Sequence, residues 1–305
     1  MVAIVTMLNR IVVVNRLDYP PAGWVIRIDS RLPLSRRNRR LRRPRSPRHS
    51  GNVRARNAKR GRIAGMERLP EKSIGHCLAI RDCGLADYRQ ILQLQQELHD
   101  ERREGKTPDT VLIVEHPPVI TLGARTTANS LLVSREELYK RHIDLVEVRR
   151  GGGVTAHNPG QLVFYPMMHL RELGLGVSDY IRKLEAIGTE LLEQLGVQSM
   201  RQKGFPGLWV TECGSTDTTD GKQRTTTHER RETKKIALIG VQVSKGVTYH
   251  GMAINIQNDL SIFELIVPCG LEGVEMTSVL KETGKRNAMD EVKQRLAYIL
   301  TKGFG

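Results

Sequence analysis

Apolar side chains recur at helical spacing in three stretches of the chain, and each stretch predicts a helix. The first covers residues 88–98. The second covers residues 181–195, with Ser178 as the expected N-cap and Gly196 as the residue that ends the helix. The third covers residues 290–300 near the end of the sequence. Between these stretches the pattern changes to short apolar runs, which are typical of strands.

Five such runs predict strands: Val111–Glu115, Val163–Pro166, Leu208–Val210, Lys235–Val243 and Gly251–Ile256. The first run is followed by His-Pro-Pro, and proline ends a strand because it cannot donate to the ladder. Helices and strands do not alternate regularly, which indicates an α/β fold of the mixed, α+β kind. Residues 212–234 carry Thr, Asp, Gly and charged side chains without an apolar period, so we expect a flexible insertion there.

The distribution of charge divides the chain into two parts. The 305 residues carry a formal charge of +15, but residues 1–66 alone hold 17 Lys and Arg against two Asp. Residues 67–305 therefore hold 31 basic and 31 acidic residues and are neutral overall. We expect residues 1–66 to be an Arg-rich, disordered extension and residues 67–305 to be a single catalytic domain.

The extension has several possible meanings. The Arg31–Arg48 block is Arg-rich and acid-poor like an organellar targeting peptide, although it carries few Ser residues. It also fits a nucleic-acid-binding arm or a segment upstream of a true start at Met66. A secretory signal is disfavoured, because no apolar region leads to a small-residue cleavage site. Apolar runs such as Ile11–Val14 are too short to cross a bilayer, which excludes an integral membrane protein.

The cysteines do not predict a metal site or a disulfide framework. Four are present, namely Cys77, Cys83, Cys213 and Cys269, and none lies in a CxxC or a Cys/His cluster with zinc-ligand spacing. Cys269 has the context of a reactive thiol, since it lies at a Pro-Cys-Gly corner after an apolar run. A nucleophilic thiolate needs a partner that stabilises it, and His157, His250 and a lysine are the candidates.

Three further segments carry groups that can bind a ligand. Arg150–Gln161 reads RGGGVTAHNPGQ, whose glycines allow a close backbone approach to a carbonyl or an anion. It matches neither the P-loop nor the dinucleotide-binding pattern. His250 and Gly251 precede an apolar strand, and Lys235 begins another. A lysine beside an acidic thiol favours the thiolate.

Together these segments resemble the lipoyl(octanoyl) transferase family over residues 85–300, about 70% of the chain. The motifs that carry the resemblance are EHPPVITLG from Glu115, RGGGVTAHNPGQ from Arg150, KIALIGVQV from Lys235, HGMAINI from His250 and PCGLEGVEMTS from Pro268. They occur in the family's order and spacing. The resemblance implies the biotin/lipoate protein ligase fold, which is a mixed β-sheet flanked by helices.

The resemblance also implies roles for individual residues. Cys269 is expected to be the acyl-thioester nucleophile, and Lys235 to lower its pKa and take part in proton transfer. His250 is a supporting residue. The expected substrate pocket consists of Arg150, Gly151, Gly152, Gly153, Val154, Thr155, Ala156, His157, Leu238, Ile239, Gly240, Gly251, Met252 and Ala253. The sequence departs from the family at Ala156, where an aromatic residue is usual, and at Asn158, where glycine is usual.

The implied activity is transfer of an octanoyl group from octanoyl-acyl carrier protein to a lysine of a lipoyl domain, as a step of lipoate biosynthesis. The implied acceptors are the lipoyl domains of 2-oxoacid dehydrogenases and the H protein of glycine cleavage. No cofactor, metal, membrane or specific nucleic acid is expected. The expected compartment is the cytoplasm, or the mitochondrial matrix or plastid if residues 1–66 are a transit peptide. A protein that starts at Met66 is predicted to keep full activity.

Three alternatives remain at this stage. An ATP-dependent lipoate or biotin ligase of the same fold does not need a nucleophilic cysteine, so Cys269 with Lys235 argues against it. A nucleic-acid-binding protein would act through its Arg-rich arm, and the neutral body argues against a wider basic surface. A catalytically inactive relative is disfavoured because Cys269, Lys235, His157 and His250 are all present.

Overall fold

The computed structural model describes residues 3–7, 10–16, 24–28, 78–211, 233–270 and 273–304, with backbone only for the first three segments and for residue 269. The strands are β1 (Ala3–Met7), β2 (Arg10–Arg16), β3 (Trp24–Ile28), β4 (Leu78–Leu85), β5 (Asp109–Glu115), β6 (Val119–Leu122), β7 (Asp144–Glu147), β8 (Thr155–His157), β9 (Gln161–Met167), β10 (Met200–Gln202), β11 (Phe205–Thr211), β12 (Thr233–Ser244) and β13 (Val247–Asn255). The α-helices are α1 (Tyr88–Arg103), α2 (Arg135–Lys140), α3 (Val177–Gln194), α4 (Val279–Thr283) and α5 (Met289–Phe304). Short 3₁₀ turns are η1 (Thr126–Ala128), η2 (Leu260–Leu265) and η3 (Pro268–Gly270).

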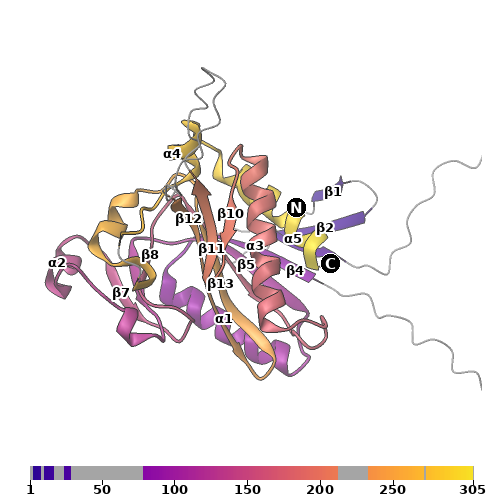
Figure 1. Ribbon diagram of the computed structural model, residues 1–305. Helices are drawn as coiled ribbons and strands as arrows, with labels where there is room; N and C mark the ends of the chain where they lie inside the picture. The colour runs from indigo at the N-terminus through magenta and orange to yellow at the C-terminus, as the bar shows by residue number, and fades with distance from the viewer. Residues whose placement is uncertain are drawn as a thin grey trace, which may run out of the picture.

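A large mixed sheet forms the centre of the molecule (Figure 1). Its strands lie in the order β1-β2-β3-β4-β5-β9-β13-β12-β11-β10. Within the described strands β4 and β5 are parallel and the other neighbours antiparallel. The parallel pair is joined by α1, as a parallel connection requires. This arrangement confirms the predicted mixed sheet.

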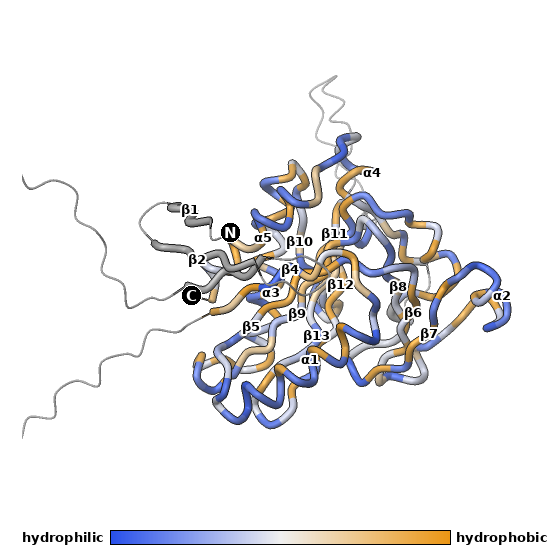
Figure 2. The backbone as a smooth tube through the Cα atoms, turned by 180° about the vertical axis from the view of Figure 1, so that it is seen from behind, coloured by the Kyte–Doolittle hydropathy of each residue, from blue (hydrophilic) through white to orange (hydrophobic). Residues whose placement is uncertain are grey.

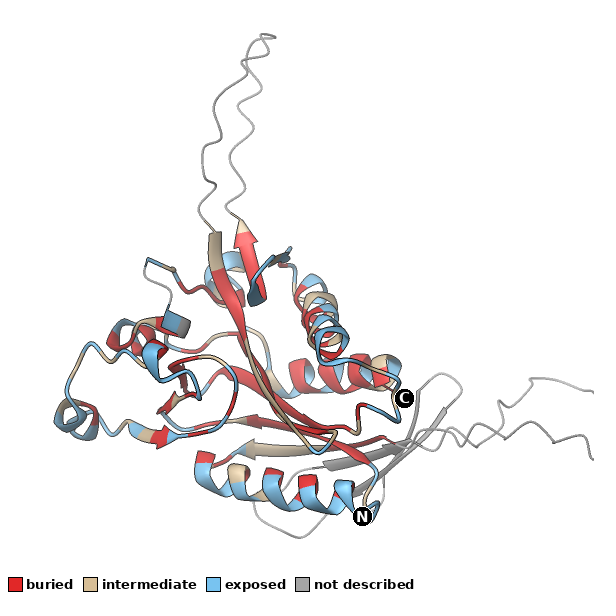
Figure 3. Cartoon of the chain, turned by 60° about the horizontal axis from the view of Figure 1, so that its bottom comes forward, coloured by how far each residue is buried: buried red, intermediate tan, exposed pale blue. Residues whose placement is uncertain are grey.

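Helices cover both faces of the large sheet (Figure 3), so its central strands are apolar throughout. Val111 and Ile113 of β5 point to the core beneath α3 and α5, whereas Leu112 and Val114 point to the core beneath α1. Successive side chains of a strand point to opposite faces, and here both faces are buried. The continuous apolar run in the sequence reflects this double burial.

A second, smaller sheet in the order β7-β6-β8 lies beside the large one, together with α2 and the 3₁₀ turns (Figure 1). Its core includes Ile120, Val154, Ala156 and Phe263. Figure 2 shows the outlying α2 segment as mostly hydrophilic. Leu238 lies on β12 of the large sheet, but its side chain packs in the core of the small sheet. The junction between the sheets is where the predicted motifs meet.

The helix boundaries agree with the sequence patterns except at one cap. Asp87 caps α1 by accepting bonds from the second and third backbone amides that follow it. Helix α3 begins at Val177 with Gly176 as N-cap, so the prediction of Ser178 as N-cap is wrong by two residues. Gly196 lies just beyond the helix in the left-handed region with φ +84°, as predicted for a terminating glycine.

All five predicted strands are present, and the structure adds others, among them the eight-residue β4. Strands β1–β3 extend the sheet from β4 and were not among the predicted elements. The Arg31–Arg48 block and the boundary at Met66 lie outside the described residues, as do residues 212–232 of the expected insertion. Residues 233 and 234 belong to β12. Among the described residues, no helix has the length and apolarity needed to span a membrane.

Candidate active site

A cavity lies where β12 and β13 meet the small sheet and the start of α1. It is lined by Tyr88, Arg150, Gly151, Gly152, Thr155, His157, Val163, Tyr165, Leu238, Ile239, Gly240, His250, Gly251, Met252 and Ala253. Twelve of these residues were assigned to the site from the sequence, and the structure adds Tyr88, Val163 and Tyr165. Segments that are about 100 residues apart in the chain therefore line one cavity.

The pairing of β12 with β13 brings two of the predicted motifs together. Leu238 pairs with Ala253, and Gly240 pairs with Gly251. A Cβ atom on Gly251 would lie 2.1 Å from the carbonyl oxygen of Phe164 on β9, so a side chain there would push the strands apart. The glycine in this motif is thus required by the close approach of β13 and β9.

The Arg150 side chain binds the glycine loop, which is residues 150–153. Its guanidinium donates to the carbonyl oxygens of Gly153 at 2.8 Å and Gly151 at 3.2 Å, and to that of Thr121 on β6 at 2.9 Å. The amide of Gly151 donates to Val241 of β12 at 3.0 Å. The loop is therefore fixed to both sheets, with a buried positive charge beside the cavity.

Three predicted pocket residues lie outside the cavity lining. Val154 and Ala156 alternate with Thr155 along the chain and point into the core of the small sheet. Gly153 packs against η1, where a Cβ atom would lie 2.2 Å from the carbonyl oxygen of Ala128. Asn158, the other departure from the family pattern, donates to the carbonyl of Asp259 at 2.7 Å. It thereby ties the pocket motif to the segment after β13.

One wall of the cavity is built from stacked aromatic and imidazole rings. The ring of Tyr88 stacks on His157 with centroids 5.7 Å apart, and it also contacts His116 at 5.0 Å. His116 Nδ1 donates to the carbonyl of Ala86 at 2.8 Å, so Nε2 of the neutral ring accepts from the Tyr165 hydroxyl at 2.9 Å. The hydrogen bonds thus set the tautomer of His116.

The imidazoles of this wall are neutral near pH 7. Burial lowers the pKa of His116 to about 4 and the pKa of His157 to about 3. Burial and the charge of Arg150 lower the pKa of His250 to about 3. His250 has φ +58°, and its Nδ1 atom is buried without a hydrogen-bond partner among the described atoms. Neither His157 nor His250 supplies the positive charge that a thiolate needs.

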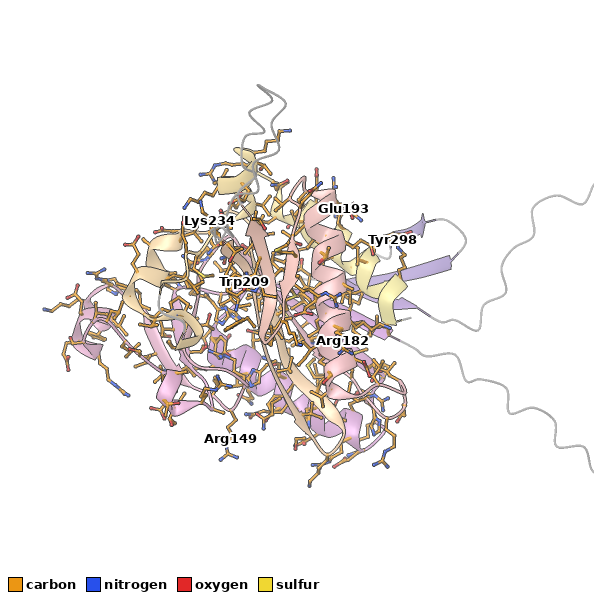
Figure 4. The ribbon with its side chains drawn as sticks, in the orientation of Figure 1. Arg149, Arg182, Glu193, Trp209, Lys234 and Tyr298 are labelled. Atoms are coloured by element: carbon orange, nitrogen blue, oxygen red, sulfur yellow. The ribbon has the colours of Figure 1, made fainter. Side chains whose placement is uncertain are left out.

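Lys235, the predicted catalytic lysine, is buried on β12 but is not among the residues that line the cavity. It is 2% exposed, and its Nζ atom lies 4.8 Å from the centroid of the Trp209 ring. Its neighbour Lys234 points to the other side of β12, with Nζ 3.6 Å from a carboxylate oxygen of Glu275. Figure 4 labels Trp209 among the central strands and Lys234 above it, near the start of β12. The two adjacent lysines therefore have different surroundings.

The Pro-Cys-Gly corner that holds Cys269 is η3, a 3₁₀ turn. A Cβ atom on the next residue, Gly270, would lie 2.7 Å from the Ala128 side chain, which also contacts Gly153 of the pocket loop. Six residues after Cys269, the carbonyl of Glu275 accepts a bond from the Lys235 amide at 2.8 Å. The backbone therefore connects the cysteine turn both to the glycine loop and to the start of β12.

A buried ion cluster contacts the end of the pocket motif at Gly160. Lys293 of α5 lies 3.0 Å from Glu115 and 3.6 Å from Asp82. The second carboxylate oxygen of Glu115 accepts a bond from the amide of Gly160 at 2.9 Å. Within the described part of the chain, no group of three His, Cys, Asp or Glu side chains is arranged to hold a metal ion.

Comparison with known proteins identifies the group to which this arrangement is similar. Residues 87–301 match the family described as the lipoyl protein ligase A/B catalytic domain. The chain is 40% identical to the octanoyltransferase of Syntrophobacter fumaroxidans over 221 residues, covering 72% of this chain and 88% of that protein. It is 36% identical to the mitochondrial octanoyltransferase LIP2 of Arabidopsis thaliana, covering 74% of this chain and 88% of that protein.

Solved structures show the same fold at low sequence identity. A bipartite lipoate protein ligase from Thermoplasma acidophilum superposes with a TM-score of 0.52 at 15% identity, covering 72% of this chain and 80% of the ligase. A lipoate-protein ligase A bound with ATP gives a TM-score of 0.50 at 17% identity, covering 72% and 82%. The fold and the family resemblance predicted from the sequence are both confirmed.

Proposed function

Because the chain belongs to the lipoyl protein ligase A/B catalytic-domain family and is an acyltransferase like its octanoyltransferase relatives, we propose that it transfers an octanoyl group through a Cys269 thioester. The donor is octanoyl-acyl carrier protein. The acceptor is a lysine of a lipoyl domain or of the glycine cleavage H protein, and the product serves lipoate biosynthesis. The observation that supports this proposal is the burial of Lys235 at the start of β12, next to the segment that follows the Cys269 turn.

The first step of the proposed reaction is an exchange of thioesters. The Cys269 thiolate attacks the octanoyl carbonyl carbon, a new C–S bond forms, and the bond to the carrier sulfur breaks. The carrier sulfur takes the proton of the Lys235 ammonium and leaves as a thiol, so Lys235 is neutral when the second step begins. The ammonium of Lys235 stabilises the Cys269 thiolate before the attack. In the glycine loop the Gly151 amide already donates to Val241, and the amide of Gly152, which lines the cavity, is the proposed donor to the developing oxyanion. One thioester replaces another, so the step is nearly balanced in free energy and needs no ATP.

The second step forms an amide. The ε-amine of the acceptor lysine attacks the Cys269 thioester, an N–C bond forms, and the bond to sulfur breaks. The amine loses a proton in this step, and Lys235 is the proposed acceptor. The amide is more stable than the thioester, which drives the transfer forward.

The cavity supplies the binding surface for the acyl chain. Leu238, Ile239, Met252 and Ala253 give it apolar sides. The neutral ring of His157 adds no charge, and Arg150 is the charged residue of the lining. Burial of an apolar chain contributes about 0.8 kcal/mol per methylene, or on the order of 5 kcal/mol for an octanoyl group. This contribution retains the acyl group between the two steps.

Intact-protein mass spectrometry tests the thioester. Mixing the enzyme with octanoyl-acyl carrier protein should add one octanoyl group to the protein, and Cys269→Ser should abolish the adduct. The adduct should disappear when a lipoyl domain is added and reappear as a mass increase of that domain. An unmodified wild-type enzyme, with the donor thioester shown to be intact, would refute the mechanism.

The two adjacent lysines provide a matched control. Lys235→Ala should reduce acyl-enzyme formation by about a hundredfold or more, the lower range for loss of an acid–base group. Lys234→Ala removes the same side chain one residue earlier, where it lies beside Glu275, and should leave the rate within about twofold. Equal losses in the two variants would contradict the role assigned to Lys235.

The alternative of an ATP-dependent ligase is tested by the same assay. Transfer from octanoyl-acyl carrier protein without ATP is expected here. Transfer only from free octanoate or lipoate with ATP would identify a ligase. We propose the cytoplasm as the site of the reaction, or the mitochondrial matrix or plastid if residues 1–66 direct import. A fluorescent protein fused to residues 1–66 distinguishes these compartments.

A further inference from the structure

An indole ring faces the buried side chain of Lys235. The Nζ atom of Lys235 lies 4.8 Å from the centroid of the Trp209 ring, within the range of a cation–π contact. Both residues are almost fully buried, so water competes little with the ring for the ammonium. The Trp209 indole is itself fixed, because its Nε1 atom donates to the carbonyl of Phe205 at 3.2 Å and its ring meets the Phe205 ring edge-on.

A β-bulge creates this pair. Leu208 of β11 pairs with Ala237 of β12, so a regular antiparallel register would pair Trp209 with Ile236. The register shifts between Leu208 and Trp209, and Trp209 pairs with Lys235 instead. Residues directly opposite each other share one face of the sheet, so the bulge places the lysine and the indole on the same side. Ile236, the extra residue, is fully buried in the core beneath α3.

Gly207 provides room for the stem of the lysine. It lies two residues before Trp209 on the same strand, and a Cβ atom there would lie 3.0 Å from Lys235 Cε and 2.3 Å from the carbonyl oxygen of Ala237. Its φ of +120° is also a conformation that favours glycine. The bulge, the glycine and the indole together direct the Lys235 side chain along one path.

We propose that Trp209 is the positioning residue of Lys235: its ring holds the ammonium in place and favours its charged form while the thiolate awaits the donor. This inference rests on the proposed role of Lys235 in the octanoyl transfer. It assigns no contact between Trp209 and the substrate. The ring acts through the lysine, by the attraction between a cation and the negative face of an aromatic system.

Two carboxylates lie on segments that pack around Lys235, and each has partners of its own. Glu185 of α3 accepts a bond from the Gly207 amide at 3.2 Å. Glu275 pairs with Lys281 at 2.7 Å and with Lys234 at 3.6 Å. Cys269 is the thiol expected to pair with the lysine. A change confined to the electron density of the indole leaves all of these groups as they are, so its effect reports on the ring alone.

Fluorinated tryptophans provide that change. The chain has two tryptophans, Trp24 and Trp209, so a Trp24→Phe protein made with mono-, di- and tetrafluorotryptophan carries the label at Trp209 only. Each added fluorine withdraws electrons from the ring face and weakens its attraction for a cation, while the ring keeps nearly the same size. The readout is the pH profile of octanoyl-enzyme formation, measured by intact mass in single turnovers.

The expected result is a graded loss of rate at pH 7 with increasing fluorination, about tenfold at tetrafluorotryptophan. The pH range of activity should narrow in the same order. A weaker ring lets Lys235 lose its proton at lower pH, and without the ammonium beside it Cys269 forms its thiolate only at higher pH. Trp209→Phe should retain more activity than Trp209→Leu, with both variants checked for unchanged circular dichroism.

The failures of the two proposals are distinguishable. If the unfluorinated Trp24→Phe protein forms no octanoyl adduct although the donor is intact, the proposed function itself is wrong. If that protein forms the adduct but the fluorinated series shows the same rate and pH profile throughout, the positioning role of Trp209 is refuted. A loss that does not follow the degree of fluorination also refutes it, since a purely structural effect is not graded by ring electrostatics.

Discussion

Acidification should destabilise the protein through the histidine wall of the cavity. His116, His157 and His250 are buried, and their pKa values are lowered to about 4, 3 and 3. In the unfolded chain a histidine has a pKa of about 6.5. Between these values the unfolded state binds protons that the folded state does not. The contribution of these residues to stability is therefore complete above pH 6.5 and is lost as the pH falls through about 4 for His116 and about 3 for His157 and His250.

The size of the effect follows from the separation of the pKa values. At pH 5 each unfolded imidazole is almost fully protonated, while the folded ones remain mostly neutral. Protonation of each unfolded histidine therefore lowers the unfolding free energy at pH 5 by about 2 kcal/mol relative to pH 7.5, and the three histidines together lower it by about 6 kcal/mol. Domains of this kind have total stabilities of roughly 5–15 kcal/mol. The protein should therefore be close to unfolding at pH 5, well above the range in which most carboxylates titrate.

Urea unfolding followed by tryptophan fluorescence at pH 7.5, 6.5, 6.0 and 5.5 measures this loss. Two histidines form a matched pair for the test, because both have positive φ, which asparagine tolerates well. His250 is buried and His142 is exposed. His250→Asn should reduce the slope of unfolding free energy against pH by about 1.2 kcal/mol per pH unit near pH 5.5, and His142→Asn should leave it unchanged.

The refuting result is equally specific. If the wild-type stability is constant between pH 7.5 and 5.5, the three imidazoles are not buried as neutral groups. If the two asparagine variants have the same slope, the pH dependence arises elsewhere in the protein.

Two further predictions concern support for the pocket. Lys293→Met leaves the carboxylates of Asp82 and Glu115 uncompensated and should lower the unfolding free energy by about 3–5 kcal/mol. Lys302→Met removes one exposed ion pair and should lower the unfolding free energy by less than about 1 kcal/mol. Thermal melts compare the two variants, and equal shifts in melting temperature would contradict the prediction. Gly123→Ala places a Cβ atom 2.2 Å from the carbonyl oxygen of Gly152 and should abolish octanoyl-enzyme formation. Gly176→Ala, where φ is −79° and the nearest atom would lie 3.4 Å from the added Cβ atom, should keep that activity, so its loss there would argue against a steric cause.

The fold was predictable where local pattern and burial agree. The helix at residues 88–103 and the strands built on continuous apolar runs follow from periodicity alone. The three-residue strand β8 and the four-residue strand β6 do not, because their pairing is between distant segments and each is too short to show a period. The cap of α3 was missed because Ser178 is a good cap by type, whereas the backbone leaves the extended conformation only after Gly176.

The site was predictable as a set of motifs but not as a surface. Consecutive residues of a strand point to opposite sides, so a motif read as one unit includes Val154 and Ala156, which belong to the core. Tyr88 and Tyr165 reach the cavity from a helix and a neighbouring strand, and sequence spacing gives no sign of this. The histidine of the EHPP segment was a usable signal: His116 lies outside the cavity lining but contacts the lining residues Tyr88 and Tyr165.

The position of Lys293 has a consequence for how the enzyme is made. Helix α5 is synthesised after every other described element, yet its lysine neutralises Glu115, which holds the amide of Gly160 in the pocket motif. Helix α5 also contributes Val292 and Leu296 to the core of the large sheet. A growing chain on the ribosome therefore carries an open core and an unsupported pocket until helix α5 emerges, and a chain that terminates before α5 lacks both the core residues and the lysine that this helix supplies.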